Sequence, residues 1–168
     1  MKYSDIYRLY STSQPKDAIH QALREVPVDD SDEQYEDRSP LHLACQYGDT
    51  EGVKILLERD AEPNTKDANG STPIHILGRT SAGCADEDKL KEIAVMLIEQ
   101  GANIPRSAKN TTALIECIRN RHFKMAEAII DSGARVNSTD LNGENVLFGF
   151  CAASGDLSLI HISEPTRL

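Results

Sequence analysis

The sequence predicts an all-α fold made of stacked helical repeats. Two blocks of similar sequence, "SPLHLACQYGD" and "TPIHILGRT", place Pro40 and Pro73 33 residues apart. Apolar helical stretches that end in a short turn recur as "VKILLERDAEPN", "AVMLIEQGANIP" and "AEAIIDSGARVN". A fixed period of roughly 20–50 residues is typical of repeat architectures, in which neighbouring units share one core.

These blocks resemble the ankyrin repeat, whose usual form is D-x-x-G-x-T-P-L-H-x-A, then a glycine, a leucine-rich second helix and G-A-D-x-N. Two blocks carry the Pro-[Leu/Ile]-His signature and three carry the second-helix ending, over about Gln34 to Asp156. The resemblance implies two antiparallel helices per unit, hairpin loops between units and a curved solenoid. The expected units are residues 37–66, 67–106, 107–139 and a partial unit at 140–156.

The segment before the repeats predicts two short amphipathic helices within residues 1–27, in "SDIYRLYS" and "PKDAIHQALREV". Their expected apolar contacts are Ile6, Leu9, Ile19, Ala22, Leu23 and Val26. Because the end of a solenoid otherwise exposes an apolar face, we interpret these helices as an N-terminal cap. Residues 28–36 follow as an acidic linker, within "PVDDSDEQYED", which has six acids and no base. We interpret this run as solvated, and the alternative is a binding segment for a basic partner.

Two prolines mark the starts of the first helices. Pro40 and Pro73 suit the first helical turn, because that position needs no N–H group. Ser39 and Thr72 directly before them can cap free backbone amides. The sequence therefore predicts helices that begin at Pro40 and Pro73.

The ends of the second helices and one insertion separate the units. Gly101 and Gly133 follow apolar helices where a left-handed cap is needed, whereas Asp60 takes that place in the first unit and predicts a strained or differently closed cap. From the proline position to this glycine position the first unit spans 20 residues and the second spans 28. The extra residues lie within residues 79–89, where Asp86 is placed to cap the second helix. We interpret them as a tolerated surface loop, and the alternative is a family-specific contact loop.

The last residues, 157–168, do not continue the repeat pattern. In register with the first unit, Ser163 and Glu164 fall on two leucine positions and Pro165 falls inside the second helix, so all three oppose folding. Residues 157–167 also match the translation of a common transposase-type sequencing-library adapter. We therefore expect the natural sequence of this fragment to stop at about Asp156 and the tail to be an artefact.

Composition and charge limit the classes of function. The formal net charge of -9 disfavours unspecific binding to phosphate backbones and anionic lipid. No apolar run reaches the roughly 18 residues of a membrane helix, and the N-terminus lacks the apolar core of a secretion signal. We expect an intracellular monomer, cytoplasmic or nuclear, that binds neither nucleic acid nor membrane.

No catalytic or metal-binding constellation is present in the sequence. The cysteines are Cys45, Cys84, Cys117 and Cys151, and no CxxC pair occurs. His42 and His75 invite an acid–base interpretation, but in the ankyrin pattern this histidine bridges backbone groups of neighbouring loops. We expect no catalytic residue, no cofactor and no metal, and a chain that is not an enzyme. The resemblance also implies that Asn64 and Asn137 can be hydroxylated by an oxygenase.

The resemblance implies a protein–protein interaction scaffold that binds its partner through a concave face. The alternative is a regulatory ankyrin domain of a longer protein whose enzyme or channel domain is lost by truncation. The expected partner-binding residues are Tyr35, Arg38, Gln46, Tyr47, Asn69, Arg79, Lys109, Arg119 and Asn120. Four of these are basic, so we expect an acidic or carboxylate-rich peptide, with Tyr47 as its apolar anchor and Arg79 and Arg119 as charge partners.

Overall fold

A computed structural model describes residues 2–80, 86–103 and 112–134. Within these ranges the regular elements are α-helices and one short 3₁₀ helix, η1. They are α1 (Tyr3–Ser11), α2 (Lys16–Glu25), η1 (Glu33–Tyr35), α3 (Pro40–Gln46), α4 (Thr50–Leu57), α5 (Pro73–Gly78), α6 (Glu87–Glu99), α7 (Ala113–Arg119) and α8 (Phe123–Asp131). The partial unit at 140–156 and the tail at 157–168 lie outside the described residues.

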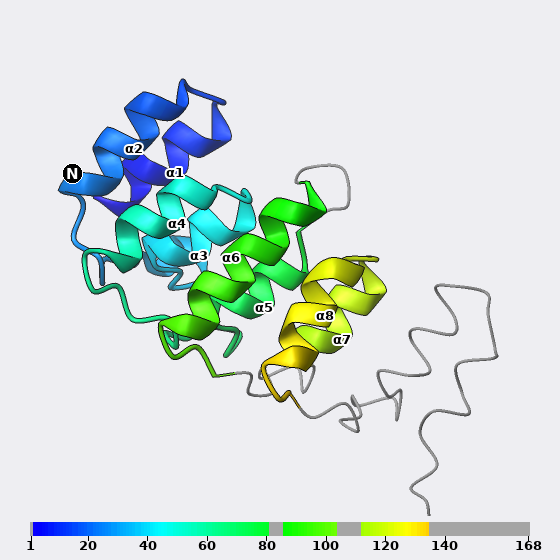
Figure 1. Ribbon diagram of the computed structural model, residues 1–168. Helices are drawn as coiled ribbons and strands as arrows, with labels where there is room; N and C mark the ends of the chain where they lie inside the picture. Colours follow the sequence, from blue (N-terminus) through cyan, green and yellow to red (C-terminus); the bar gives the residue numbers. More distant parts are fainter. Residues whose placement is uncertain (1, 81–85, 104–111, 135–168) are drawn as a thin grey trace, which may run out of the picture.

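The helices form two layers along a row of helix–turn–helix units (Figure 1). In one layer α3 packs on α1 and on α5, and α5 packs on α7. In the other layer α4 packs on α2 and on α6, and α6 packs on α8. This arrangement confirms the predicted all-α repeat solenoid, in which each unit buries its apolar side against its neighbours.

Local signals in the sequence set where the helices begin. Helices α3 and α5 start at Pro40 and Pro73, as predicted. The predicted cap of α6 is also present, because the Asp86 carboxylate accepts a hydrogen bond from the Asp88 amide at 3.1 Å. The α5–α6 connection is correspondingly long, since α5 ends at Gly78 and α6 begins at Glu87. Residues 81–85 of that insertion lie outside the described ranges.

The second helices end in the left-handed conformation. Gly101 and Gly133 have φ values of 85° and 89°, which glycine adopts without steric cost. Asp60 takes the same conformation with φ 61°, so the first unit keeps the cap geometry in spite of its side chain. The cap of the first unit is therefore strained and not differently closed. The strain arises because the Cβ atom of a non-glycine residue disfavours this region.

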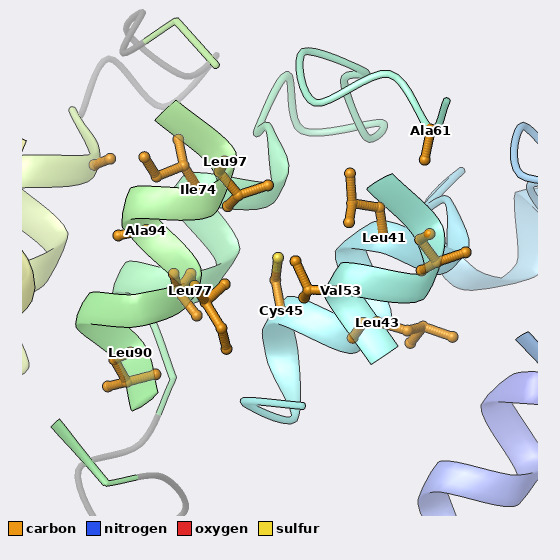
Figure 2. Packing of buried hydrophobic residues seen from close by; sticks show 14 of the residues in the cluster. Leu41, Leu43, Cys45, Val53, Ala61, Ile74, Leu77, Leu90, Ala94 and Leu97 are labelled. Carbon is orange, nitrogen blue, oxygen red and sulfur yellow. The ribbon is translucent and has the colours of Figure 1, made fainter. Parts of the chain in front are cut away.

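One hydrophobic core runs through the N-terminal helices and the repeats. The apolar contacts expected in α1 and α2 are buried, except that Leu9 packs against the core from a partly exposed position. Cys45 of α3 and Val53 of α4 lie on the side of their helix pair that faces Leu77 of α5 (Figure 2). Leu56 in α4 is 0% exposed. The division into cap, linker and units by residue range stays a proposal.

The acidic segment of residues 27–37 is tied to its surroundings. The carboxylate of Asp30 accepts a hydrogen bond from the Tyr3 amide at 2.7 Å. The carboxylate of Asp32 accepts one from the Gln34 amide at 2.9 Å, at the start of η1. The Glu36 carbonyl accepts a third from the amide of residue 68, at 2.8 Å, in the loop before α5. The first and third of these hydrogen bonds hold the segment beside α1 and the loop before α5.

Candidate functional site

The candidate site is the inner face, which we define as the exposed side of α1, α3, α5 and α7 with the segments that flank these helices. Most residues predicted to bind a partner belong to it. They are Tyr35 in η1, Arg38 before α3, Gln46 and Tyr47 at the end of α3, Asn69 before α5, Arg79 after α5, and Arg119 and Asn120 at the end of α7. Lys109 lies outside the described residues.

All five tyrosines of the chain lie at the N-terminal end of the inner face, either on it or directly beneath it. Tyr3, Tyr7 and Tyr10 come from α1, Tyr35 from η1 and Tyr47 from the end of α3. The Tyr7 and Tyr35 ring centroids are 4.3 Å apart, those of Tyr3 and Tyr35 are 5.7 Å apart, and those of Tyr10 and Tyr47 are 4.8 Å apart. We call these five residues the tyrosine strip.

Helical spacing places the first three members of the strip. Tyr3, Tyr7 and Tyr10 follow the i, i+4, i+7 pattern, which aligns side chains along one face of α1. Tyr3 and Tyr10 are buried, Tyr7 is half-buried, and Tyr47 at the end of α3 is 36% exposed. Tyr35 and Tyr47 were predicted as site residues but Tyr7 was not, although its helical spacing from Tyr3 is visible in the sequence.

A buried polar cluster supports the strip from behind. The Tyr10 hydroxyl donates a hydrogen bond to the Asp49 carboxylate at 2.8 Å, and the His20 Nε2 atom lies 3.0 Å from the same carboxylate. Burial, and then the nearby Asp49 charge, raise the pKa of the Tyr10 hydroxyl. Burial also raises the pKa of the Tyr3 and Tyr47 hydroxyls. The phenol groups of Tyr3, Tyr10 and Tyr47 are therefore neutral at pH 7.

The Arg38 guanidinium lies along α3 and has acidic partners within the chain. Its nitrogens lie 2.5 Å from the Glu36 carboxylate and 3.6 Å from the Asp67 carboxylate. A third nitrogen donates a hydrogen bond to the Gln46 side chain at 2.9 Å. Arg38 and Gln46, two predicted site residues, are thus in contact, and the positive charge of Arg38 is balanced locally.

Arg79 and Asn120 join α5 to α7. The Arg79 guanidinium lies 3.2 Å from the Glu116 carboxylate and donates a hydrogen bond to the Ser71 hydroxyl at 3.0 Å. The Asn120 side chain donates to the Gly78 carbonyl at 3.0 Å and to the Glu116 carbonyl at 2.9 Å. Glu116 was not foreseen as part of the site. Its carboxylate reduces the positive charge that Arg79 was expected to offer a ligand.

His42, Cys45 and Cys117, in α3 and α7, have structural roles. The His42 Nδ1 atom accepts a hydrogen bond from the Ser39 amide at 3.1 Å, and its Nε2 atom donates one to the Ser71 carbonyl at 3.1 Å. Burial lowers the pKa of His42 to about 4, so the ring is neutral at pH 7. Burial also raises the pKa of the Cys45 and Cys117 thiols, which disfavours the reactive thiolate.

Asn64 connects the ends of the first and second units. Its side-chain nitrogen donates to the Gly101 carbonyl at 3.0 Å, and its side-chain oxygen accepts from the Asn103 amide at 2.7 Å. Asn137, the other predicted hydroxylation site, lies outside the described residues. Modification of Asn64 stays a prediction.

The described ranges contain neither a metal-binding group of side chains nor a helix that could span a membrane. In residues 2–80, 86–103 and 112–134, no three His, Cys, Asp or Glu side chains are grouped so that they could hold a metal ion. The helices of that same part of the chain include none that is long and apolar enough to cross a membrane.

Comparison with known proteins identifies the repeat. Residues 22–77 match the family described as "Ankyrin repeats (many copies)". The chain is 38% identical over 69 residues to a Caenorhabditis elegans protein named transient receptor potential cation channel subfamily A member 1 homolog, an alignment that covers 41% of the chain and 6% of that protein.

Two further relatives are similar over longer stretches. Ankyrin repeat protein nuc-2 of Neurospora crassa is 26% identical over 151 residues, which are 89% of the chain and 13% of that protein. Neurogenic locus notch homolog protein 1 of Mus musculus is 34% identical over 108 residues, which are 64% of the chain and 4% of that protein. The chain therefore spans only a small part of the length of these relatives.

Proposed function

Because the chain is an ankyrin-repeat protein, we propose that it is a non-catalytic scaffold that binds a segment of another protein on its inner face. The observation that carries this proposal is the partly exposed tyrosine strip. Tyrosine is enriched at protein interfaces, because its ring supplies a large rigid contact area and its hydroxyl keeps a polar end. Tyr47 is the most exposed member at 36% and is the proposed anchor.

The charges on the inner face give little support to the expected acidic partner. The guanidinium of Arg38 already faces Glu36 and Asp67, and that of Arg79 already faces Glu116. An acidic peptide would have to compete with these carboxylates. Arg119 is exposed at the end of α7, and its expected role as a charge partner for such a segment stays a proposal.

A second candidate places the same binding unit in a longer protein. In this version the chain is a regulatory ankyrin domain, and an enzyme or channel domain lies elsewhere in the full protein. It is favoured by the small share of each relative that the chain covers, 13% or less, and by the relative that is named as a cation channel homolog. A downstream reading frame that encodes a catalytic signature or a membrane span would support this candidate.

A pull-down from cell lysate tests the inner-face proposal. The wild-type chain is compared with Tyr47→Ala and Arg119→Glu. The matched controls are Ile130→Ala and Lys54→Glu, which change exposed residues of the outer helices α8 and α4. We expect a partner that both controls retain and that Tyr47→Ala loses. If all variants retain the partner equally, the inner face is not the binding surface, and the 79–89 insertion or the acidic segment becomes the better candidate.

A further inference from the structure

We propose that the tyrosine strip binds a basic peptide segment through arginine, with guanidinium groups lying on the exposed Tyr47 and Tyr7 rings and their charge balanced by the carboxylates of residues 27–37. This inference rests on the proposed inner-face function and names the chemistry of the partner at the N-terminal end of that face. It differs from the acidic partner expected from the sequence.

The Tyr47 and Tyr7 rings are the exposed aromatic surface of the strip. The Tyr47 ring is stacked on Tyr10 with an interplanar angle of 10°, so one face is covered. Tyr47 nevertheless remains 36% exposed. Tyr7 is half-buried, and its ring centroid lies 4.3 Å from that of Tyr35. The exposed parts of the Tyr47 and Tyr7 rings offer aromatic faces on which a planar cation can stack.

The segment beside these rings is negatively charged. Residues 27–37 carry six carboxylates and no base, and Tyr35 of the strip belongs to this segment. Asp32 lies close enough to the Tyr3 hydroxyl to act on it electrostatically. The neighbouring base, Arg38, is already paired with carboxylates. Lys2 and Arg8 stand next to Tyr3 and Tyr7 in the sequence, but the six carboxylates outnumber them, so the charge here, like the net charge of -9, favours a basic over an acidic peptide.

Arginine suits this surface better than lysine does. A guanidinium is planar, is weakly hydrated and stacks on aromatic faces, whereas the lysine ammonium is a compact and strongly hydrated charge. A flat aromatic surface with carboxylates at its side satisfies both the face and the N–H donors of arginine. Arginine should therefore bind better than lysine at equal peptide charge.

Fluorescence anisotropy with labelled peptides tests the proposal on the full chain. Three flexible glycine–serine peptides of equal length carry arginine, lysine or glutamate at the same positions. We expect the arginine peptide to bind most tightly, the lysine peptide several-fold more weakly and the glutamate peptide not at all. Raised salt should weaken the charge contribution to binding.

Variants separate the role of the ring from that of charge. Tyr47→Phe should keep the affinity for the arginine peptide, and Tyr47→Ala should lower it about tenfold, the loss of about 1.4 kcal/mol expected for a modest interface anchor. Glu33→Lys should also weaken binding. Glu92→Lys makes the same charge change at an exposed position of the outer helix α6 and should have little effect. Thermal unfolding of each variant shows whether it is folded.

Several results would overturn the proposal. These are equal arginine and lysine affinities, equal losses from Glu33→Lys and Glu92→Lys, unchanged binding by Tyr47→Ala, and tighter binding of the glutamate peptide. If Tyr47→Ala does not fold, Glu33→Lys and the peptide series still decide. If no peptide binds while a pulled-down partner depends on Tyr47, this inference fails and the proposed function stands. If that partner depends on neither Tyr47 nor Arg119, both fail.

Discussion

The Nε2 atom of His42 in α3 donates a hydrogen bond to the carbonyl oxygen of Ser71, 3.1 Å away in the loop before α5. Its Nδ1 atom accepts a hydrogen bond from the Ser39 amide, which it can do only while the ring is neutral. A buried side chain thus links the first unit to the next. Protonation of Nδ1 would remove an acceptor and place a charge in the core.

Acid should therefore destabilise the fold through His42. Burial lowers the folded-state pKa to about 4, whereas the unfolded value is about 6.5. Between these values the unfolded chain binds the proton and the folded chain does not. The contribution of His42 is thus complete above pH 6.5 and is lost as the pH falls toward 4, by up to about 3 kcal/mol.

Urea unfolding at pH 7 and at pH 4.5 measures this effect. The control is His42→Gln, which cannot take up a proton but keeps all other titrating groups. We expect the stability difference between wild type and His42→Gln to shrink at the lower pH. Identical pH dependence in the two proteins would show that His42 does not titrate as stated.

Leu56→Ala should strongly destabilise the stack. Leu56 is 0% exposed in α4, which packs on both α2 and α6, so truncation leaves a cavity between units. The expected cost is roughly 2–5 kcal/mol, measured by urea or thermal unfolding. Leu57→Ala, in the same helix but partly exposed, should cost less. A loss for Leu56→Ala well under about 1 kcal/mol would contradict the packing of α4 between its neighbours.

Gly52→Ala should disturb the cluster behind the tyrosine strip. A Cβ atom at Gly52 would lie 2.5 Å from an Asp49 carboxylate oxygen and 2.9 Å from the Tyr10 hydroxyl, which is closer than atoms can approach. Asp49 or Tyr10 must therefore move, at an expected cost of about 1–3 kcal/mol. The control is Glu51→Ala at an exposed position of the same helix turn. Unchanged unfolding of Gly52→Ala would show that this contact is not tight.

The signals that act through the local backbone could be predicted from the sequence. Pro40 and Pro73 fix helix starts because proline suits the first turn, and Gly101 and Gly133 fix helix ends because glycine accepts positive φ. The repeat period then gave the order of the stacked units. To predict these features, it is enough to align the repeats in the correct register.

Contacts between distant residues could not be predicted in the same way. Glu116 is 37 residues from Arg79, so a count of basic side chains on the inner face did not reveal that the pair neutralises itself. Asp67 balances Arg38 for the same reason. Tyr7 is different, because its helical spacing with Tyr3 was present in the sequence, but its contact with Tyr35 depends on how the acidic segment folds back.

Site-specific photo-crosslinking tests most directly whether the inner face binds the partner. A benzophenone-bearing phenylalanine replaces Tyr47 on the inner face in one protein and Ile130 on the outer helix α8 in another. Each protein is irradiated in cell lysate and its adducts are identified by mass spectrometry. The account predicts a specific adduct from position 47 that position 130 does not give. An adduct formed from position 130 alone, or equally from both positions, would contradict it.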